Sequence, residues 1–394
     1  MLPPLLSPRE RLVWTVGFVV ISALIVATGF TSTDADSLRY ATISEALATL
    51  PVARWVAPEW WGLSPDNPLT GYFLEHPAGL FWTPAALAWL GVPAAQAPYI
   101  FGVAAGLVAL LLSAKLVGRL ASREAGRASL VLLQIMPVAF VFRVRDNHEY
   151  PMLICLLAAL IGLHGVSRSW KWGLWVIAGF TAGLLIKGVF IGFVLMGAAL
   201  WIAVNPTSGS RARQASVCVA ALLVMALAAV GYDAWYARIT GGPFWSAYWE
   251  RQLGPMDVAS PLGDFWAFAQ HAGFYLGLLL FHPAPWSLAL VWAALRGGRL
   301  PGAHEPRRGL VYVLLFTAAS VLLLSLASRF AERYAFSTTY LVAAAGAAVA
   351  YAWWPGLRST LARLDERIPA FPAFVWMLLV GVRLLLGSWL PRIG

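Results

Sequence analysis

The sequence predicts an all-α polytopic membrane protein. Hydrophobic residues make up 60% of the 394 residues and charged residues only 12%, with a mean hydropathy of +0.72. Water-soluble domains do not have this composition. Twelve apolar segments follow one another, separated by short polar connections. We expect a single bundle of about 11–12 transmembrane helices, since ~20 apolar residues cross a bilayer. This one domain would occupy residues 1–394, without a soluble C-terminal domain.

The apolar segments define the expected spans in order. The first follows Arg9, Glu10 and Arg11 and lacks a convincing cleavage site, which indicates an uncleaved span rather than a signal peptide. The short segment 77–90 is expected to be re-entrant or interfacial. The long segment around Lys187 is expected to split there, because a Lys at a helix centre costs on the order of 2.5–3.5 kcal/mol. The segments are 12–30, 77–90, 98–117, 128–142, 150–167, 172–186, 188–204, 215–237, 265–294, 309–328, 334–354 and 371–390.

Two long connections are predicted on the outward face. Residues 31–76 contain amphipathic pieces, Leu38 to Leu50 and Trp55 to Trp61, suited to helices that lie in the interface. Residues 238–264 are rich in Gly and Pro, which is typical of a loop that acts as a lid. Cys155 and Cys218 lie in apolar segments and are expected to be buried, without metal-ligand or disulfide spacing.

The distribution of charge predicts the orientation. With a cytoplasmic N-terminus, the cytoplasmic loops hold 17 of the 28 Lys and Arg residues but only five of the 18 Asp and Glu residues. The outward loops are net acidic, as the positive-inside rule requires. The net charge of +10 is therefore a topology signal, and it argues against nucleic-acid binding.

Unusual polar residues gather in the outward loops. Asp34 and Asp36 follow the first span directly, and five ionisable residues lie between two spans: Arg143, Arg145, Asp146, His148 and Glu149. Lys187 lies at the expected turn between two short spans, where an anionic partner is favoured over simple snorkelling. The segment Arg329 to Tyr334, with Arg333, suits a lipid-phosphate clamp, although a plain loop is the alternative. His76 opens the segment 77–90. His271 and His282 are only weak metal-ligand candidates.

These signatures, in this order, resemble the polyprenyl-phosphate-sugar-dependent glycosyltransferases of the GT-C fold. The nearest branch is the aminoarabinose-transferase and protein O-mannosyltransferase superfamily, similar to glycosyltransferase family 39. The resemblance spans about 12–355 and rests on several short motifs. They are Asp36 to Ile43, Tyr72 to Pro77, Arg143 to Asp146, Ile186 to Gly188, Pro285-Trp286 and Arg329 to Tyr334. His76 replaces the usual Lys, and Ala78 the second Pro, so a donor-phosphate contact at this position departs from the family pattern.

The resemblance implies a membrane glycosyltransferase, a hexosyl- or pentosyltransferase of the cell envelope. It would transfer one sugar from an undecaprenyl- or dolichyl-type phosphate, with inversion, to a hydroxyl on the non-cytoplasmic face of the inner membrane. The acceptor would be a glycolipid, a glycan or a protein. Asp36 is expected to be the base, with Asp146 as the second catalytic carboxylate.

The remaining expected roles concern binding. Donor-phosphate contacts are expected from Lys187, Arg329, Arg333, Tyr334 and His76. Sugar or acceptor contacts are expected from Glu75, Arg143, His148 and Glu149. No cofactor is expected; a divalent metal would be an optional aid through the carboxylates. The rival hypotheses are a polyprenyl-phosphate or lipid flippase, which needs no base, and a non-catalytic subunit of an envelope-assembly complex.

Overall fold

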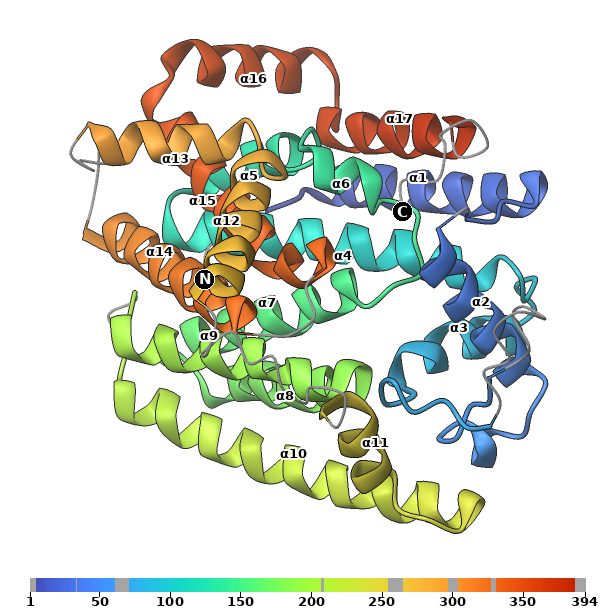
Figure 1. The fold of residues 1–394 in the computed structure, drawn as a ribbon. Coiled ribbons are helices and arrows are strands. Elements are labelled where there is room, and N and C mark those ends of the chain that lie inside the picture. The colour runs from blue at the N-terminus through green and yellow to red at the C-terminus, as the bar shows by residue number, and fades with distance from the viewer. Residues whose placement is uncertain are drawn as a thin grey trace.

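The chain forms a helical bundle in a computed structural model that describes residues 5–32, 34–60, 71–206, 209–253, 265–296, 304–326 and 331–386 (Figure 1). Among these residues no strand is formed beyond one isolated bridge between Glu59 and Tyr72. The all-α prediction is therefore confirmed for the described part of the chain.

The helices follow one another along the chain as labelled in Figure 1. They are α1 (Pro8–Thr28), α2 (Ala35–Ala48), η1 (Val52–Arg54), α3 (Gly79–Trp89), α4 (Ala97–Leu120), α5 (Arg123–Leu132), α6 (Pro137–Val141), α7 (Glu149–Val166), η2 (Trp170–Trp172), α8 (Gly173–Lys187), η3 (Gly188–Phe190), α9 (Ile191–Val204), α10 (Arg211–Thr240), α11 (Phe244–Leu253), α12 (Phe265–Phe281), α13 (Trp286–Leu295), α14 (His304–Ser325), η5 (Glu332–Ala335), α15 (Phe336–Trp353), α16 (Pro355–Arg367) and α17 (Phe371–Leu386).

The structure confirms a multi-pass membrane protein. Seven described helical segments are long and apolar enough to cross a membrane, or up to nine if each of two bent pairs is one span. The predicted span 128–142 is wrong, because the chain breaks between α5 and α6, where Pro137 starts the shorter helix. In the segment 77–90, α3 has 11 residues and rises only about 16 Å, so it does not cross on its own.

Lys187 lies where the chain reverses. α8 ends at Lys187, and Gly188 follows with φ +55° and ψ −117°. A Cβ placed on Gly183 would lie 2.6 Å from Ile191 Cδ1 and 3.7 Å from Val194 Cγ2. In a continuous helix the 11 residues from Gly183 to Val194 would rise about 16 Å. α8 and α9 therefore pack against each other, as the expected split at Lys187 requires. By length and composition alone, Trp170–Val204 counts as one apolar helical segment.

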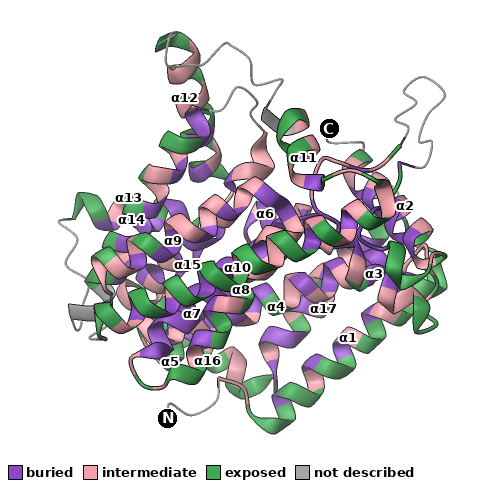
Figure 2. Cartoon of the chain, turned by 90° about the horizontal axis from the view of Figure 1, so that it is seen from below, coloured by how far each residue is buried: buried purple, intermediate pink, exposed green. Residues whose placement is uncertain are grey.

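α7 is the central helix of the bundle. Within its membrane-spanning window 94% of the residues are buried, against 17% for α10, which lies along the lower edge of the molecule in Figure 1 and crosses the face seen from below in Figure 2. α8 approaches α7 closely, because a Cβ on Gly179 would lie 2.5 Å from the carbonyl oxygen of Cys155. Small residues allow such close approach between membrane helices. The burial of α7 carries the polar residues at its N-terminal end into the interior.

Loops assigned to the same face by the charge pattern meet in the structure. Arg127 Nη2 lies 2.7 Å from Glu10 Oε1 and 2.6 Å from Asp365 Oδ2, which joins α5 to α1 and α16. Arg213 Nη1 donates to the carbonyl oxygens of Val166 and Ser167. These contacts bring described parts of the basic loops together in two groups, in agreement with a shared face; which compartment that face meets stays a prediction.

The connection after α1 holds one of its two expected helices. α2 corresponds to the predicted Leu38 to Leu50 helix and packs Tyr40, Ile43 and Leu47 against Phe73 and Phe81. A helix over Trp55 to Trp61 is wrong for the described residues, since the helical turn η1 ends at Arg54 and Pro58 lacks a backbone donor. Trp61 lies outside the described residues. The expected lid at 238–264 contains α11, while residues 254–264 also lie outside them.

Candidate active site

The first turn of α2 separates the two neighbouring aspartates. Asp34 is the N-cap, and its Oδ2 accepts a hydrogen bond from the Ser37 backbone N–H at 2.9 Å. Its Oδ1 lies 3.5 Å from Arg145 Nη1. Asp36, two residues on, forms an ion pair with Arg333 of η5. Asp34 therefore holds the helix end, whereas Asp36 faces a cation from the C-terminal part of the chain.

A second ion pair, which unlike the first is buried, lies close by. Lys187 Nζ is 3.8 Å from Glu149 Oε1, and the two side chains are only 7% and 1% exposed. The same ammonium group lies 4.9 Å from the ring centre of Phe190 and 5.7 Å from that of Tyr334. A small cavity of about 30 Å³ has Glu149, Lys187, Arg333 and Tyr334 in its wall. Four predicted site residues from three separate segments thus meet at one cavity.

Asp146 is the most buried acid of the site. Its backbone N–H donates to Ser37 Oγ at 2.9 Å, which ties it to the helix that carries Asp36. Its side chain is fully buried, and neither carboxyl oxygen has a hydrogen-bond partner within the described residues. Burial, with the nearby charge of Glu149, raises the pKa of Asp146 well above its usual range. The raised pKa favours the protonated form of Asp146, which can both donate and accept a hydrogen bond.

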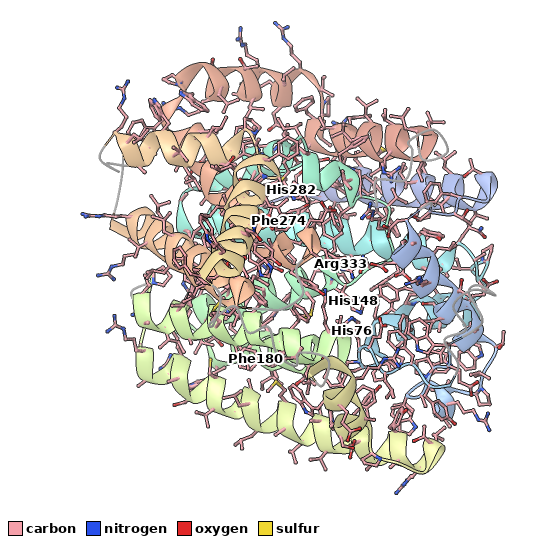
Figure 3. The ribbon with its side chains drawn as sticks, viewed as in Figure 1. His76, His148, Phe180, Phe274, His282 and Arg333 are labelled. Atoms are coloured by element: carbon pink, nitrogen blue, oxygen red, sulfur yellow. The ribbon has the colours of Figure 1, made fainter. Side chains whose placement is uncertain are left out.

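Two histidines line the same region. The rings of His76 and His148 lie 4.4 Å apart, and Tyr40 packs edge-on to His148 at 4.9 Å. Burial, with a smaller contribution from Lys187, lowers the pKa of His76 to about 3. Burial, His76 and Lys187 together hold the pKa of His148 well below its ordinary value. Both imidazoles are therefore neutral at pH 7. Figure 3 shows His76, His148 and Arg333 following one another in the middle of the bundle.

Some predicted residues are not part of this cluster. Arg143 is buried, but its Nη2 donates to the Gln134 carbonyl oxygen at 2.6 Å, just beyond the end of α5. Glu75 lies 3.9 Å from Arg251 of α11, and both side chains are more than a third exposed. Arg329 lies outside the described residues. The structure therefore groups Asp36, Asp146, His76, His148, Glu149, Lys187, Arg333 and Tyr334, and it places Arg143 apart. Glu75 borders this cluster, because its charge acts on Tyr40.

Contacts that the sequence did not predict complete the site. Phe190 and Tyr40 pack on the functional side chains; Tyr40 lies in the Asp36 to Ile43 motif, whereas nothing in the sequence distinguishes Phe190 from other aromatic residues. Tyr248, in the expected lid, accepts a hydrogen bond at 2.9 Å from the backbone N–H of Val189. α11 therefore rests on the hairpin tip that carries Lys187. Among the described residues, no group of three or more His, Cys, Asp and Glu side chains is arranged to hold a metal ion.

Comparison with known proteins gives a family match over part of the chain. Residues 75–232 match the family model described as dolichyl-phosphate-mannose-protein mannosyltransferase. This segment holds Glu75, His76, Asp146, Glu149 and Lys187, but not Asp36 or Arg333. No curated protein sequence matches the chain.

Solved structures show the same fold over nearly the whole chain. ArnT from Cupriavidus metallidurans in the apo state is 15% identical, with a TM-score of 0.63 over 95% of this chain and 76% of that one. The same protein bound to undecaprenyl phosphate gives 16% identity and a TM-score of 0.59, over 95% and 77%.

A more distant structure shares the architecture. The oligosaccharyltransferase AglB from Archaeoglobus fulgidus, in complex with an inhibitory peptide and a dolichol-phosphate, is 12% identical with a TM-score of 0.54. The match covers 97% of this chain but only 55% of AglB. The chain is a multi-pass membrane protein with the GT-C fold, similar to ArnT and, over 75–232, to the dolichyl-phosphate-mannose-protein mannosyltransferases.

Proposed function

We propose that this chain is an inverting glycosyltransferase that moves one sugar from a polyprenyl-phosphate carrier to an acceptor hydroxyl. The observation that carries the proposal is the convergence of Asp36, Arg333, Lys187 and Glu149 from four separate elements. The solved relatives support the donor class, since one contains undecaprenyl phosphate and another a dolichol-phosphate. The active site would face the non-cytoplasmic side of the membrane, which the charge pattern supports.

Asp36 is the proposed base. As the acceptor oxygen attacks the anomeric carbon, its proton passes to the Asp36 carboxylate, and the bond from that carbon to the phosphate oxygen breaks. Attack opposite the leaving phosphate inverts the anomeric configuration. Asp36 is only partly exposed and, without ligand, is paired with Arg333. A donor phosphate that draws Arg333 to itself would free the carboxylate, so the base would be exposed only when the donor is in place.

Fixed positive charge would stabilise the departing phosphate. The leaving group is an anion that needs cations rather than a proton donor, and Lys187 and Arg333 line the same cavity. Tyr334, also in that wall, would donate a hydrogen bond through its hydroxyl. His76 is neutral and is therefore proposed as a hydrogen-bonding group rather than as a replacement cation. We propose no metal for this step, because the phosphate departs as a stable anion that fixed cations can hold.

The buried polar groups beyond the cavity would recognise the sugar. Asp146 has unpartnered carboxyl oxygens, and Nε2 of His148 is also without a partner within the described residues. Buried polar atoms are costly unless they are satisfied, so they favour a hydroxyl-rich ligand here. Glu75, at the border of the cluster, and Arg143, which lies apart from it, are retained as candidates for the acceptor rather than for the reacting sugar.

Replacing Asp36 with Asn tests the base. We expect transfer by purified protein from a prenyl-phosphate sugar to fall about 10²–10⁴-fold, the usual contribution of a positioned base. Binding of prenyl phosphate should persist, because Arg333 loses its competing carboxylate. Asp34→Asn is the matched control, since Asn also caps helices well. Unchanged sugar transfer by Asp36→Asn would refute the assignment.

The same experiment separates the main alternative function. A polyprenyl-phosphate flippase would use the cations but need no base, so Asp36→Asn would leave lipid movement intact and no sugar would be transferred by the parent protein. The sugar and the acceptor, whether glycolipid, glycan or protein, would follow from mass spectrometry of envelope glycolipids and glycans in a strain that lacks the chain.

A further inference from the structure

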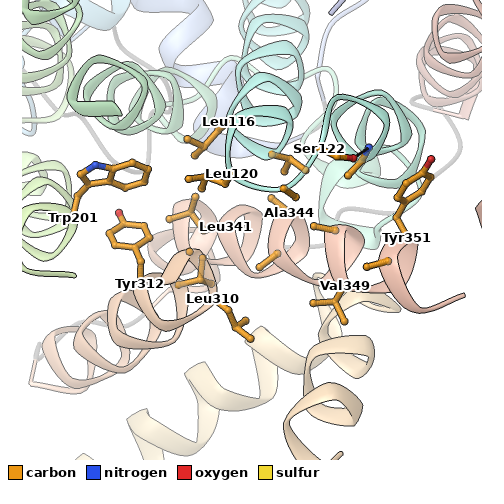
Figure 4. Close-up of a pocket in the computed structure, with 18 of the residues that line it drawn as sticks. Leu116, Leu120, Ser122, Trp201, Leu310, Tyr312, Leu341, Ala344, Val349 and Tyr351 are labelled. Carbon is orange, nitrogen blue, oxygen red and sulfur yellow. Dashed lines mark hydrogen bonds between the residues drawn. The ribbon is translucent and has the colours of Figure 1, made fainter. Parts of the chain in front are cut away.

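A large apolar cavity lies away from the active site. Its volume is about 400 Å³, against about 30 Å³ for the cavity at Lys187. α4, α5, α14 and α15 form most of its wall, with Trp201 of α9 at one end and Tyr351 at the other (Figure 4). Arg358 of α16 also lines it.

The side chains that face this cavity explain why it stays open. α15 presents small residues to it, namely Ala344, Ala345, Ala348 and Ala352, and α14 begins its contribution with Gly309. Half of the remaining wall residues are Leu or Val, and most of the others are Ala or aromatic. Such a wall offers dispersion contacts but few hydrogen bonds, so hydrocarbon fits it better than water. At about 30 Å³ for each water-sized group, the cavity has room for roughly 13 methylene-sized groups, close to one acyl chain.

The rim of the cavity carries positive charge. Arg358 is exposed, and no carboxylate lies within ion-pair distance of it in the described part of the chain. α16 has no buried residue and is strongly amphipathic, and Trp353 and Trp354 stand at its start. Helices and tryptophans of this kind are typical of the membrane interface. The rim of the apolar cavity thus combines the cation Arg358 with the interfacial helix α16.

We propose that this cavity binds one acyl chain of an anionic phospholipid, with the lipid phosphate held at Arg358. Binding of the donor lipid does not account for the cation Arg358 at the rim of this cavity. Tyr351, at the end of the cavity, is 14 residues along α15 from Ser337, which lines the Lys187 cavity, a rise of about 21 Å. A donor with its phosphate at Lys187 cannot also place that phosphate at Arg358. The predicted position of this end on the Lys- and Arg-rich face also favours an anionic phospholipid of the other leaflet.

Native mass spectrometry of the detergent-solubilised full chain tests the proposal with phosphatidylglycerol and phosphatidylcholine as probes. We expect saturable binding of one phosphatidylglycerol, with phosphatidylcholine bound at least several-fold more weakly. Arg358→Gln should lower phosphatidylglycerol affinity about fivefold, the effect of one interfacial cation. Ala348→Phe, which fills the chamber, should abolish the saturable site. Arg363→Gln on the same helix and Ala226→Phe on the exposed side of α10 are the matched controls.

Several results would overturn the proposal. Equal affinity for the two lipids, or saturable binding that neither variant changes, would mean that only surrounding bilayer lipid is being detected. Displacement of phosphatidylglycerol by a prenyl phosphate, with the same loss in Arg358→Gln, would assign the chamber to a prenyl chain instead. If Ala348→Phe does not fold, as judged by its thermal unfolding, Arg358→Gln and its control decide the question alone.

Discussion

Replacing Glu149 with Gln removes the carboxylate partner of Lys187 and leaves the ammonium group buried. The two groups lie 3.8 Å apart with exposed fractions of 7% and 1%, so solvent screens them little. The side chain of Gln has nearly the same size as that of Glu, so the packing at the N-terminal end of α7 is preserved. The change is therefore close to a pure removal of charge.

The expected effect on stability is large. At 3.8 Å two unit charges attract by about 4 kcal/mol with an effective dielectric constant of ~20. Breaking one side of a buried pair typically costs about 3–5 kcal/mol, because the other charge stays unpaired. Lys187→Met should cost a similar amount in this protein, whereas the double variant should cost much less than the sum. The coupling energy should therefore be several kcal/mol.

Ligand binding should change in opposite directions in the two variants. Lys187→Met loses a charge-assisted contact worth about 1.5–3 kcal/mol, which corresponds to a 10- to 150-fold weaker binding of prenyl phosphate. Glu149→Gln removes a negative charge beside the phosphate position and should strengthen binding of the same ligand. This reversal distinguishes an anion site from a salt bridge that serves stability alone.

A double-mutant cycle provides the measurement. The unfolding free energy of the parent, both single variants and the double variant would be obtained by denaturant titration in one detergent, together with prenyl-phosphate affinity. If the single effects add to within about 0.5 kcal/mol, the two groups do not interact and the geometry has been misjudged. Equal loss of ligand binding in both single variants would show that Lys187 is not the phosphate contact.

Two further predictions concern His76 and Gly188. Burial lowers the pKa of His76 in the folded protein to about 3, whereas an unfolded chain protonates this histidine near pH 6.5. The unfolded state therefore binds more protons between these values, and the free energy of unfolding should fall as the pH drops from about 6.5 towards 3. His76→Gln should make the free energy of unfolding depend less on pH over this range. Asp146, whose pKa is raised, contributes the opposite dependence, so the difference between variant and parent is the quantity to compare. Gly188→Ala should destabilise by about 1–3 kcal/mol, because φ is +55° and the new Cβ would meet Tyr248 Oη at 2.3 Å. Gly192→Ala, with nothing within 4 Å, is its control, and equal thermal unfolding of the two variants would contradict the strain assigned to the hairpin tip.

The sequence predicted the class of fold and much of the site because those features leave local signals. Apolar composition and segment length indicate membrane helices, and charge asymmetry indicates which loops share a face. Asp36 and Lys187 stood out because a charge beside or within an apolar segment is costly without a purpose. Asp146, His148 and Glu149 stood out because ionisable residues rarely cluster between spans.

Other features have at most a weak local signal. Pro137 is compatible with a helix start within segment 128–142, but a proline is also tolerated inside a membrane helix, so only the structure shows two short helices. Arg143 and Asp146 are three residues apart in one motif, yet the Arg143 side chain donates to Gln134 while the backbone N–H of Asp146 donates to Ser37. The course of a non-helical connection depends on partners in other segments, which a single sequence does not display.

The sequence by itself determined that this chain is a helical membrane protein with an acidic and basic cluster at one end of the bundle. Only the tertiary structure decided which charges meet: Asp36 with Arg333 across 297 positions of the chain, and Lys187 with Glu149 across 38. It also decided that a second, apolar cavity exists beside Arg358. The physical reason is that hydrophobicity acts along each segment, whereas ion pairs and cavities depend on how segments far apart in sequence pack together.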